Sequence, residues 1–274
     1  MRPDLLLVIN GALRDRLRAI INSGVIAEYV ENVLDAFEDQ NIFAATLIEP
    51  NFDPENLQQE LRVFASSASL FGAEFATGTT APPEVRTAIM NRAEEAGDAA
   101  AATLTQRVTN DARLNLFNVI TDLDARIRVG EAEFSRVQLT SQLVQDTERL
   151  TDRRIAMVAE LQTTRLSAAG GLTLLDVQGI TQYEWSAVLD NRSCPICEAL
   201  DGTVFEVRPS LDRVLGSLRA VSDAEVAERN PWHPQDLESI ERFENLSPEN
   251  IQAGGWAVPP AHPFCRCLVA PVGT

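Results

Sequence analysis

Apolar residues recur at helical spacing through the N-terminal part of the chain. Two stretches, Leu13–Ile21 and Val25–Phe37, carry apolar side chains at steps of three and four, and Ser23-Gly24 separates them. The same spacing appears in Glu55–Phe71. The pattern therefore predicts three helices in residues 1–80, which we interpret as an N-terminal helical module.

The longest pattern begins at Glu84, just after Gly78–Pro83, which predicts a linker or a sharp turn. Apolar residues then recur every three or four positions as far as Gly130, which predicts one helix of about forty-five residues. Its middle is rich in alanine, at Ala99–Ala102, and small side chains let a second helix approach closely. A helix of this length is expected to pack against a partner helix.

Two further stretches are predicted to return along this long helix. Phe134–Leu150 and Asp152–Ala169 are both periodic, and Gly170-Gly171 is expected to end the second of them. Residues 81–179 are therefore expected to form a long-helix hairpin or bundle. The apolar stripe is not a strict heptad, which disfavours a continuous coiled coil.

The period changes from helical to two after residue 179. Apolar and polar residues alternate from Tyr183 to Leu189, which predicts a half-buried strand. Thr203–Val207 is predicted to be a second strand, after a turn at Asp201-Gly202, and Cys267–Ala270 a third. These strands predict a small sheet in the C-terminal region.

The segment between the second and third strands is long and largely helical in pattern. Ser222–Glu225 has the spacing of a capping box, and Ser247-Pro248 that of an N-cap followed by proline. We interpret residues 208–257 as a helical insertion within a small α+β region at 180–274. The predicted fold class is mainly α, a long-helix hairpin or bundle followed by a short-stranded sheet with a structural zinc site.

The charge of the chain limits the classes of partner that it is expected to bind. The 274 residues carry 40 acidic and 23 basic side chains, a net charge of −17. Such a surface repels a phosphate backbone, so strong direct binding to nucleic acid is not expected. No apolar stretch approaches the ~20 residues that a membrane helix needs, so no membrane partner is expected.

The cysteines supply the candidate chemistry. The chain has four, arranged as a CxxC at Cys194 and Cys197 and a CxC at Cys265 and Cys267, with His262 shortly before the second pair. Thiols clustered in two tight pairs are typical of one tetrahedral zinc site. The predicted metal ligands are Cys194, Cys197, Cys265, Cys267 and His262, five candidates for four positions.

The ligand set stays open between two alternatives. We favour four cysteines, with a Cys3His set including His262 as the close alternative. A CxC chelates best where the backbone bends, because side chains i and i+2 of an extended strand point the same way but lie several ångströms apart. His262 also fits a histidine that supports the turn without binding metal. His233 is the other histidine of the chain, and its place in the insertion counts against a ligand role.

Disulfides and a redox-active CxxC are the competing interpretations of the thiols. The first residues do not resemble a secretory signal, so reduced thiols are expected. A thioredoxin-type CxxC opens a helix in a βαβ unit, whereas here we expect a hairpin-like turn at Leu200–Gly202. No hydrolase or nucleotide-binding motif occurs, and pairing Cys194 with His262 as a thiol protease would use residues better suited as ligands. We therefore predict that the protein is not an enzyme.

The C-terminal motifs together resemble a known family. The motif combines the tryptophan strand, the CxxC, an Asp-Gly turn and a His-Pro-x-Cys-Arg-Cys end, and the preceding helix, Arg153 to Gly170, resembles the same family. The chain looks like the phage head morphogenesis proteins similar to protein F of phage Mu, over roughly residues 85–270. The runs that carry this resemblance are Tyr183–Trp185, Asp190–Cys197, Leu200–Phe205 and Pro259–Cys267.

The resemblance implies a structural minor capsid protein of a tailed phage. Such proteins are associated with the portal or the inner head and assist head assembly or DNA delivery, without a shared catalytic activity. The implied partners are the portal and the major capsid protein, with scaffolding protein as a further candidate. The implied location is the virion head near the portal, and the host cytoplasm during assembly. Phe264 stands where the family commonly has asparagine. The alternatives are a zinc-ribbon-type nucleic-acid-binding module and a thiol-dependent redox or hydrolytic enzyme.

Overall fold

A computed structural model describes most of the chain, which divides into two compact units. Unit 1 comprises Met1–Leu13, Gln58–Ala102 and Met157–Thr274. Unit 2 comprises Arg14–Leu57 and Thr103–Ala156. We describe each unit by itself. The residues that the structure describes are 4–21, 23–38, 48, 50–51, 53–130, 135–191, 193–220, 225, 228–229, 231, 233, 237–262 and 265–272.

The predicted helices are present, and several are longer than their apolar patterns. The long predicted helix is α5, which ends near Gly130, a glycine with a positive φ of 74°. The helix predicted to end at Phe71 continues to Thr77. The main helices are α1 (Asp4–Ile20), α2 (Ser23–Glu38), α4 (Pro54–Thr77), α5 (Pro83–Arg128) and α6 (Arg136–Val177).

One prediction about these helices is wrong. The two returning helices are a single helix, α6, which passes through Gly170 and Gly171 without a break and ends before Gly179. The glycine pair serves packing and does not terminate the helix. A Cβ at Gly170 would lie 1.8 Å from the Ser69 carbonyl oxygen, and one at Gly171 would lie 2.6 Å from a Val269 methyl carbon.

The close approach between α4 and α6 in unit 1 is reciprocal. A Cβ at Gly72 of α4 would lie 1.8 Å from the Ser167 carbonyl oxygen of α6. Each helix thus provides a glycine at the point where the backbone of the other comes nearest, and any side chain there would overlap main-chain atoms. Beside this crossing, α4, α5, α6 and the segment between α4 and α5 bury a small apolar cluster formed by Ala73, Ala81, Val85, Ile89 and Leu174.

Unit 2 is a helical bundle with its own core. Helix α2 packs there with the C-terminal part of α5 and the N-terminal part of α6. Arg136 bridges Glu31 and Asp35 of α2 at 2.6 Å each, and Arg154 of α6 pairs with Asp111 of α5 at 2.6 Å. The buried residues of this core are Ile26, Tyr29, Val30, Val33, Leu34, Ala112, Leu116, Leu139 and Leu143.

The predicted small sheet lies in unit 1. Its strands are β1 (Gln182–Ser186), β2 (Val204–Glu206) and β3 (Leu268–Pro271), antiparallel in the order β2-β1-β3. Tyr183 and Trp185 are fully buried, as the alternation predicts. The predicted strand is wrong beyond Ser186, because the chain leaves the sheet there and Leu189 is exposed.

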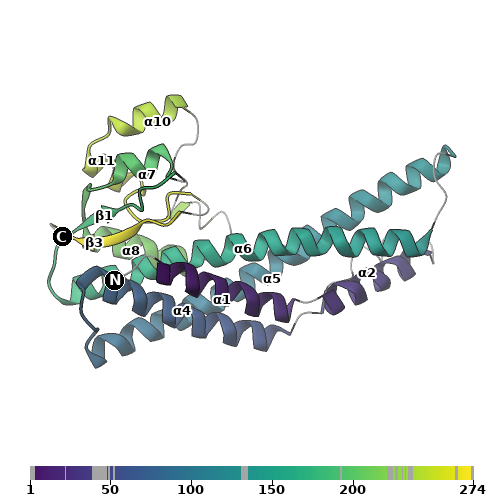
Figure 1. The fold of residues 1–274 in the computed structure, drawn as a ribbon, viewed down its shortest axis with the longest axis horizontal. Coiled ribbons are helices and arrows are strands. Elements are labelled where there is room, and N and C mark those ends of the chain that lie inside the picture. Colours follow the sequence, from purple (N-terminus) through teal and green to yellow (C-terminus); the bar gives the residue numbers. More distant parts are fainter. Residues whose placement is uncertain are drawn as a thin grey trace. The chain divides into compact units, whose positions relative to one another are not determined.

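The insertion is helical wherever the structure describes regular elements in it. Ser247 caps its last helix, since its Oγ accepts a hydrogen bond from the Asn250 N–H and Pro248 follows. The capping box predicted at Ser222–Glu225 lies largely outside the described residues. The helices of the insertion are α8 (Val207–Leu218), α10 (Leu237–Glu244) and α11 (Pro248–Ala253), and Figure 1 shows α11 closer to the sheet than α10.

The insertion is tied to the sheet by a partly buried polar network. The Tyr183 hydroxyl lies 2.6 Å from the Ala257 carbonyl oxygen and 3.1 Å from Ser210 Oγ. Gln252 of α11 reaches the outer strand, where its amide nitrogen donates to the Glu206 carbonyl and its amide oxygen accepts from the Glu206 N–H. These bonds fix α8 and α11 against β1 and β2.

The described part of the chain is thus mainly helical with a small three-stranded antiparallel sheet in the C-terminal region, which confirms the coarse fold prediction. Among the described helices, none combines the length and the apolar character needed to cross a membrane. The division of the sequence at residues 80 and 179 stays a prediction.

Candidate metal centre

The first cysteine pair sits at the start of a short helix, α7 (Pro195–Leu200). Cys194 is its N-cap, and its Sγ accepts a hydrogen bond from the Cys197 N–H at 3.3 Å, while Pro195 occupies the first helical position. The expectation that a hairpin-like turn would replace a helix here is therefore wrong. The Asp201-Gly202 turn does follow, directly after the helix, with Gly202 at a φ of 75°.

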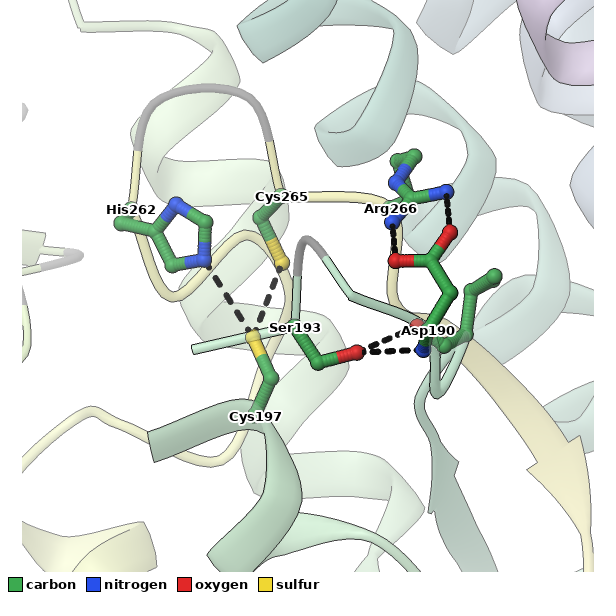
Figure 2. Close-up of polar contacts among 7 residues, drawn as sticks. Asp190, Ser193, Cys197, His262, Cys265 and Arg266 are labelled. Atoms are coloured by element: carbon green, nitrogen blue, oxygen red, sulfur yellow. Dashed lines mark hydrogen bonds and ion pairs between the residues drawn. The ribbon is translucent and has the colours of Figure 1, made fainter. Parts of the chain in front are cut away.

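The second pair reaches the same place from the other end of the C-terminal region. The Cys265 N–H donates to the His262 carbonyl at 3.2 Å, which closes a turn before the CxC. Cys197 Sγ lies 3.3 Å from His262 Nε2 and 3.9 Å from Cys265 Sγ. Figure 2 marks both contacts with dashed lines. Residues 65 and 68 positions apart in sequence thus meet around one sulfur atom.

All five predicted ligands belong to this cluster. Two overlapping groups have donor atoms within 4.8 Å of one another and could hold a metal ion; both include Cys197, the first with Cys194 and His262 and the second with Cys265 and Cys267. A tetrahedral zinc with zinc–sulfur bonds near 2.3 Å separates its sulfurs by about 3.8 Å. The Cys197–Cys265 separation of 3.9 Å fits that spacing.

The cluster favours the thiolate form at some of its sulfurs even before metal binds. Hydrogen bonding with Cys197, followed by interaction with His262, lowers the pKa of Cys194 to about 4. The pKa of Cys265 is also lowered, first by its bond with Cys197, whereas the pKa of Cys197 is raised because its proton is shared with those neighbours. A bound cation removes the remaining protons, because a coordinating thiol is deprotonated.

An ion pair braces the two halves of the cluster. Arg266 stands between the two cysteines of the CxC and forms a two-pronged pair with Asp190, at 2.7 and 2.9 Å (Figure 2). Ser193 holds the same loop, since its hydroxyl accepts from the Asp190 N–H and donates to the Val188 carbonyl. The carboxylate partner of Arg266 thus comes from the loop that leads into the CxxC.

His233 lies buried among aromatic side chains. It is 2% exposed, and its ring packs edge-on or tilted against Trp185, Phe243 and Trp256. Its Nε2 lies 2.9 Å from the Trp256 carbonyl oxygen, and it belongs to neither donor group among the described residues. The sequence does not predict this aromatic cluster around His233, because its members come from separate segments with no shared periodicity.

The buried imidazole makes the stability of the region depend on pH. Burial lowers the pKa of His233 to about 4, against an ordinary value near 6.5. The unfolded chain therefore takes up this proton first, and the folded state loses stability as the pH falls below about 6.5. We expect the unfolding free energy of the wild type to fall by about 2 kcal/mol more than that of His233→Phe between pH 7 and pH 5.

Denaturant titrations of both proteins across this pH range measure that difference. Phenylalanine keeps the aromatic packing, and acid-induced loss of any bound metal acts on both proteins. Equal slopes for the two proteins would contradict a neutral buried His233.

Comparison with known protein families relates the C-terminal half of the chain to one of them. A protein-family model described as Phage Mu protein F like protein matches residues 132–270, just over half of the 274 residues. The matched segment contains helix α6, the cysteine pairs and all five donor residues. No curated protein and no solved structure matches the chain.

Proposed function

Since the chain belongs to the phage Mu protein F-like family, we propose that it is a structural, minor component of a tailed-phage head, associated with the portal or the inner head, that assists head assembly or DNA delivery. The observation that carries this proposal is the extent of the family match, which takes in every residue of the cysteine cluster. The proposed partners are the portal and the major capsid protein, with scaffolding protein a further candidate.

The role proposed for the cluster is architectural. Four of the five donors would hold one zinc ion, which supplies a cross-link between α7 and the segment before β3. A set dominated by cysteine is typical of closed structural sites, whereas catalytic zinc sites keep an open position and use histidine or carboxylate ligands more often. On this basis we propose that the protein is not an enzyme.

The net charge of −17 supports protein partners over nucleic acid. A surface with this excess of carboxylates is repelled by the phosphate backbone and attracted to basic patches. The proposed binding surface on the portal or capsid subunit is therefore expected to carry arginine or lysine.

Analysis of purified particles tests this function. Mass spectrometry of mature heads and procapsids of the encoding phage should find the chain at a few copies per particle, cross-linked to portal or major capsid subunits. The choice of cross-linker matters, because all 23 basic residues are arginine and the sequence has no lysine. Reagents that couple carboxylates are therefore needed in place of amine-reactive esters. Absence of the chain from both kinds of particle would refute the proposal.

A further inference from the structure

A hydroxyl on the long helix α6 touches the main chain of a proposed metal ligand. Thr164 is 1% exposed, and its Oγ1 lies 3.0 Å from the Cys265 carbonyl oxygen. The same hydroxyl lies 3.1 Å from the Glu160 carbonyl one turn earlier in its own helix. The two residues of the first contact are 101 positions apart in sequence, so this is a tertiary contact between α6 and the CxC.

This contact completes the anchoring of Cys265. The Cys265 N–H donates to the His262 carbonyl, and the Cys265 carbonyl accepts from the Thr164 hydroxyl, whose single proton it shares with the Glu160 carbonyl. With both main-chain polar groups held, the direction of the Cα–Cβ bond is set, and in this arrangement Cys265 Sγ lies 3.9 Å from Cys197 Sγ. The next residue, Arg266, turns the other way to its ion pair with Asp190.

We propose that Thr164 is a positioning residue for the metal centre, through which α6 sets the geometry of the CxC ligands. The proposal rests on the metal site advanced under the proposed function. Groups that orient metal ligands without touching the metal typically change metal affinity 10- to 100-fold when removed. A buried carbonyl that loses its donor also carries a desolvation penalty, which disfavours the arrangement that keeps it buried.

Chelator competition with the purified full-length protein tests the proposal. We expect Thr164→Val to raise the zinc dissociation constant on the order of 10- to 100-fold, and Thr164→Ser to restore it to within about 3-fold of the wild type because serine keeps the hydroxyl. The cobalt-substituted forms supply a second readout, since the thiolate-to-metal absorption of Thr164→Val should shift while that of Thr164→Ser should not.

The neighbouring residue provides a matched control. Thr163 is also fully buried on α6, and its hydroxyl donates to the Ala159 carbonyl of the same helix at 2.6 Å. Thr163→Val removes that buried hydroxyl and leaves the Thr164–Cys265 bond in place, so its zinc affinity should stay within about 3-fold of the wild type.

The outcomes separate this inference from the proposed function. A wild-type protein that binds no zinc overturns the metal site and this inference together. A wild type that binds zinc, with Thr164→Val equal to it in affinity and spectrum, overturns the role of Thr164 alone. If Thr164→Val does not fold, Thr164→Ala is compared in the same titration, and unchanged affinity there has the same meaning.

Discussion

We expect removal of the proposed zinc ion to unfold the C-terminal region and to leave most of the helical signal in place. Structural zinc contributes about 10–16 kcal/mol of binding free energy in small zinc-dependent folds, which is comparable to the whole stability of a typical domain. The donors here join α7 to the segment before β3, so loss of the ion releases the connections that lead into β2 and β3 at one end of the small sheet. The helices α1, α2, α4 and α5 contribute no donor to the cluster.

Two spectroscopic signals separate these regions. The three tryptophans, Trp185, Trp232 and Trp256, all lie in the C-terminal part of the sequence, so their fluorescence reports on that part. On addition of a strong chelator we expect the emission to move to longer wavelength and the first thermal transition to fall, while far-ultraviolet circular dichroism keeps most of its helical amplitude.

A variant sharpens this test. Cys197 belongs to both donor groups, so Cys197→Ser should abolish stable metal binding and should no longer respond to chelator. The chelated wild type and the untreated variant should then melt alike. A wild type that contains no metal and melts identically with and without chelator would falsify the proposed centre.

Replacing Gly170 with alanine will destabilise unit 1 by an amount on the order of 4 kcal/mol. The added Cβ would lie 1.8 Å from the Ser69 carbonyl oxygen, far inside van der Waals contact. The obstructing atom belongs to the main chain of α4, so no rotamer change can relieve the overlap and the two helices must separate. Separation also disturbs Val269 of β3, which lies against Gly171.

A second glycine supplies the control for this substitution. Gly11 lies within α1, and a Cβ built there meets no atom within 4 Å. Gly11→Ala should therefore stabilise the protein by about 0.4–1 kcal/mol, because alanine reduces the freedom of the unfolded chain. Denaturant unfolding of both variants gives the comparison. Equal effects at the two positions would show that α4 and α6 do not approach as closely as described.

Local patterns predict the helices well and their ends less well. The apolar stripe of α5 is long and regular, and nothing interrupts it before Gly130, so its length can be predicted closely. Gly170-Gly171 misleads because a glycine pair is locally a stop signal, while its purpose here depends on α4, about a hundred residues earlier in the chain. Tertiary packing overrides local propensity at that point.

In the candidate site, too, local sequence patterns predict some features, and others depend on tertiary contacts. The spacing of the cysteines predicts that the two pairs meet, and the structure brings Cys197 and Cys265 to 3.9 Å. The helix at the CxxC is missed, although Pro195 after a residue able to accept a capping bond is the available signal. The Thr164 contact has no such signal, because a threonine inside a helix looks the same whether or not it meets a distant loop.

The amide of Gln252 has a consequence for how other chains can approach the sheet. In the register of β1 and β2, the main-chain groups of Val204 and Glu206 point away from β1, along the free border of the sheet. Gln252 already satisfies both groups of Glu206, as an added strand would. An incoming strand would have to displace the Gln252 side chain from Glu206, and would gain new main-chain hydrogen bonds only at Val204. This border is therefore a poor template for strand addition and aggregation, which protects a small sheet in a crowded assembly.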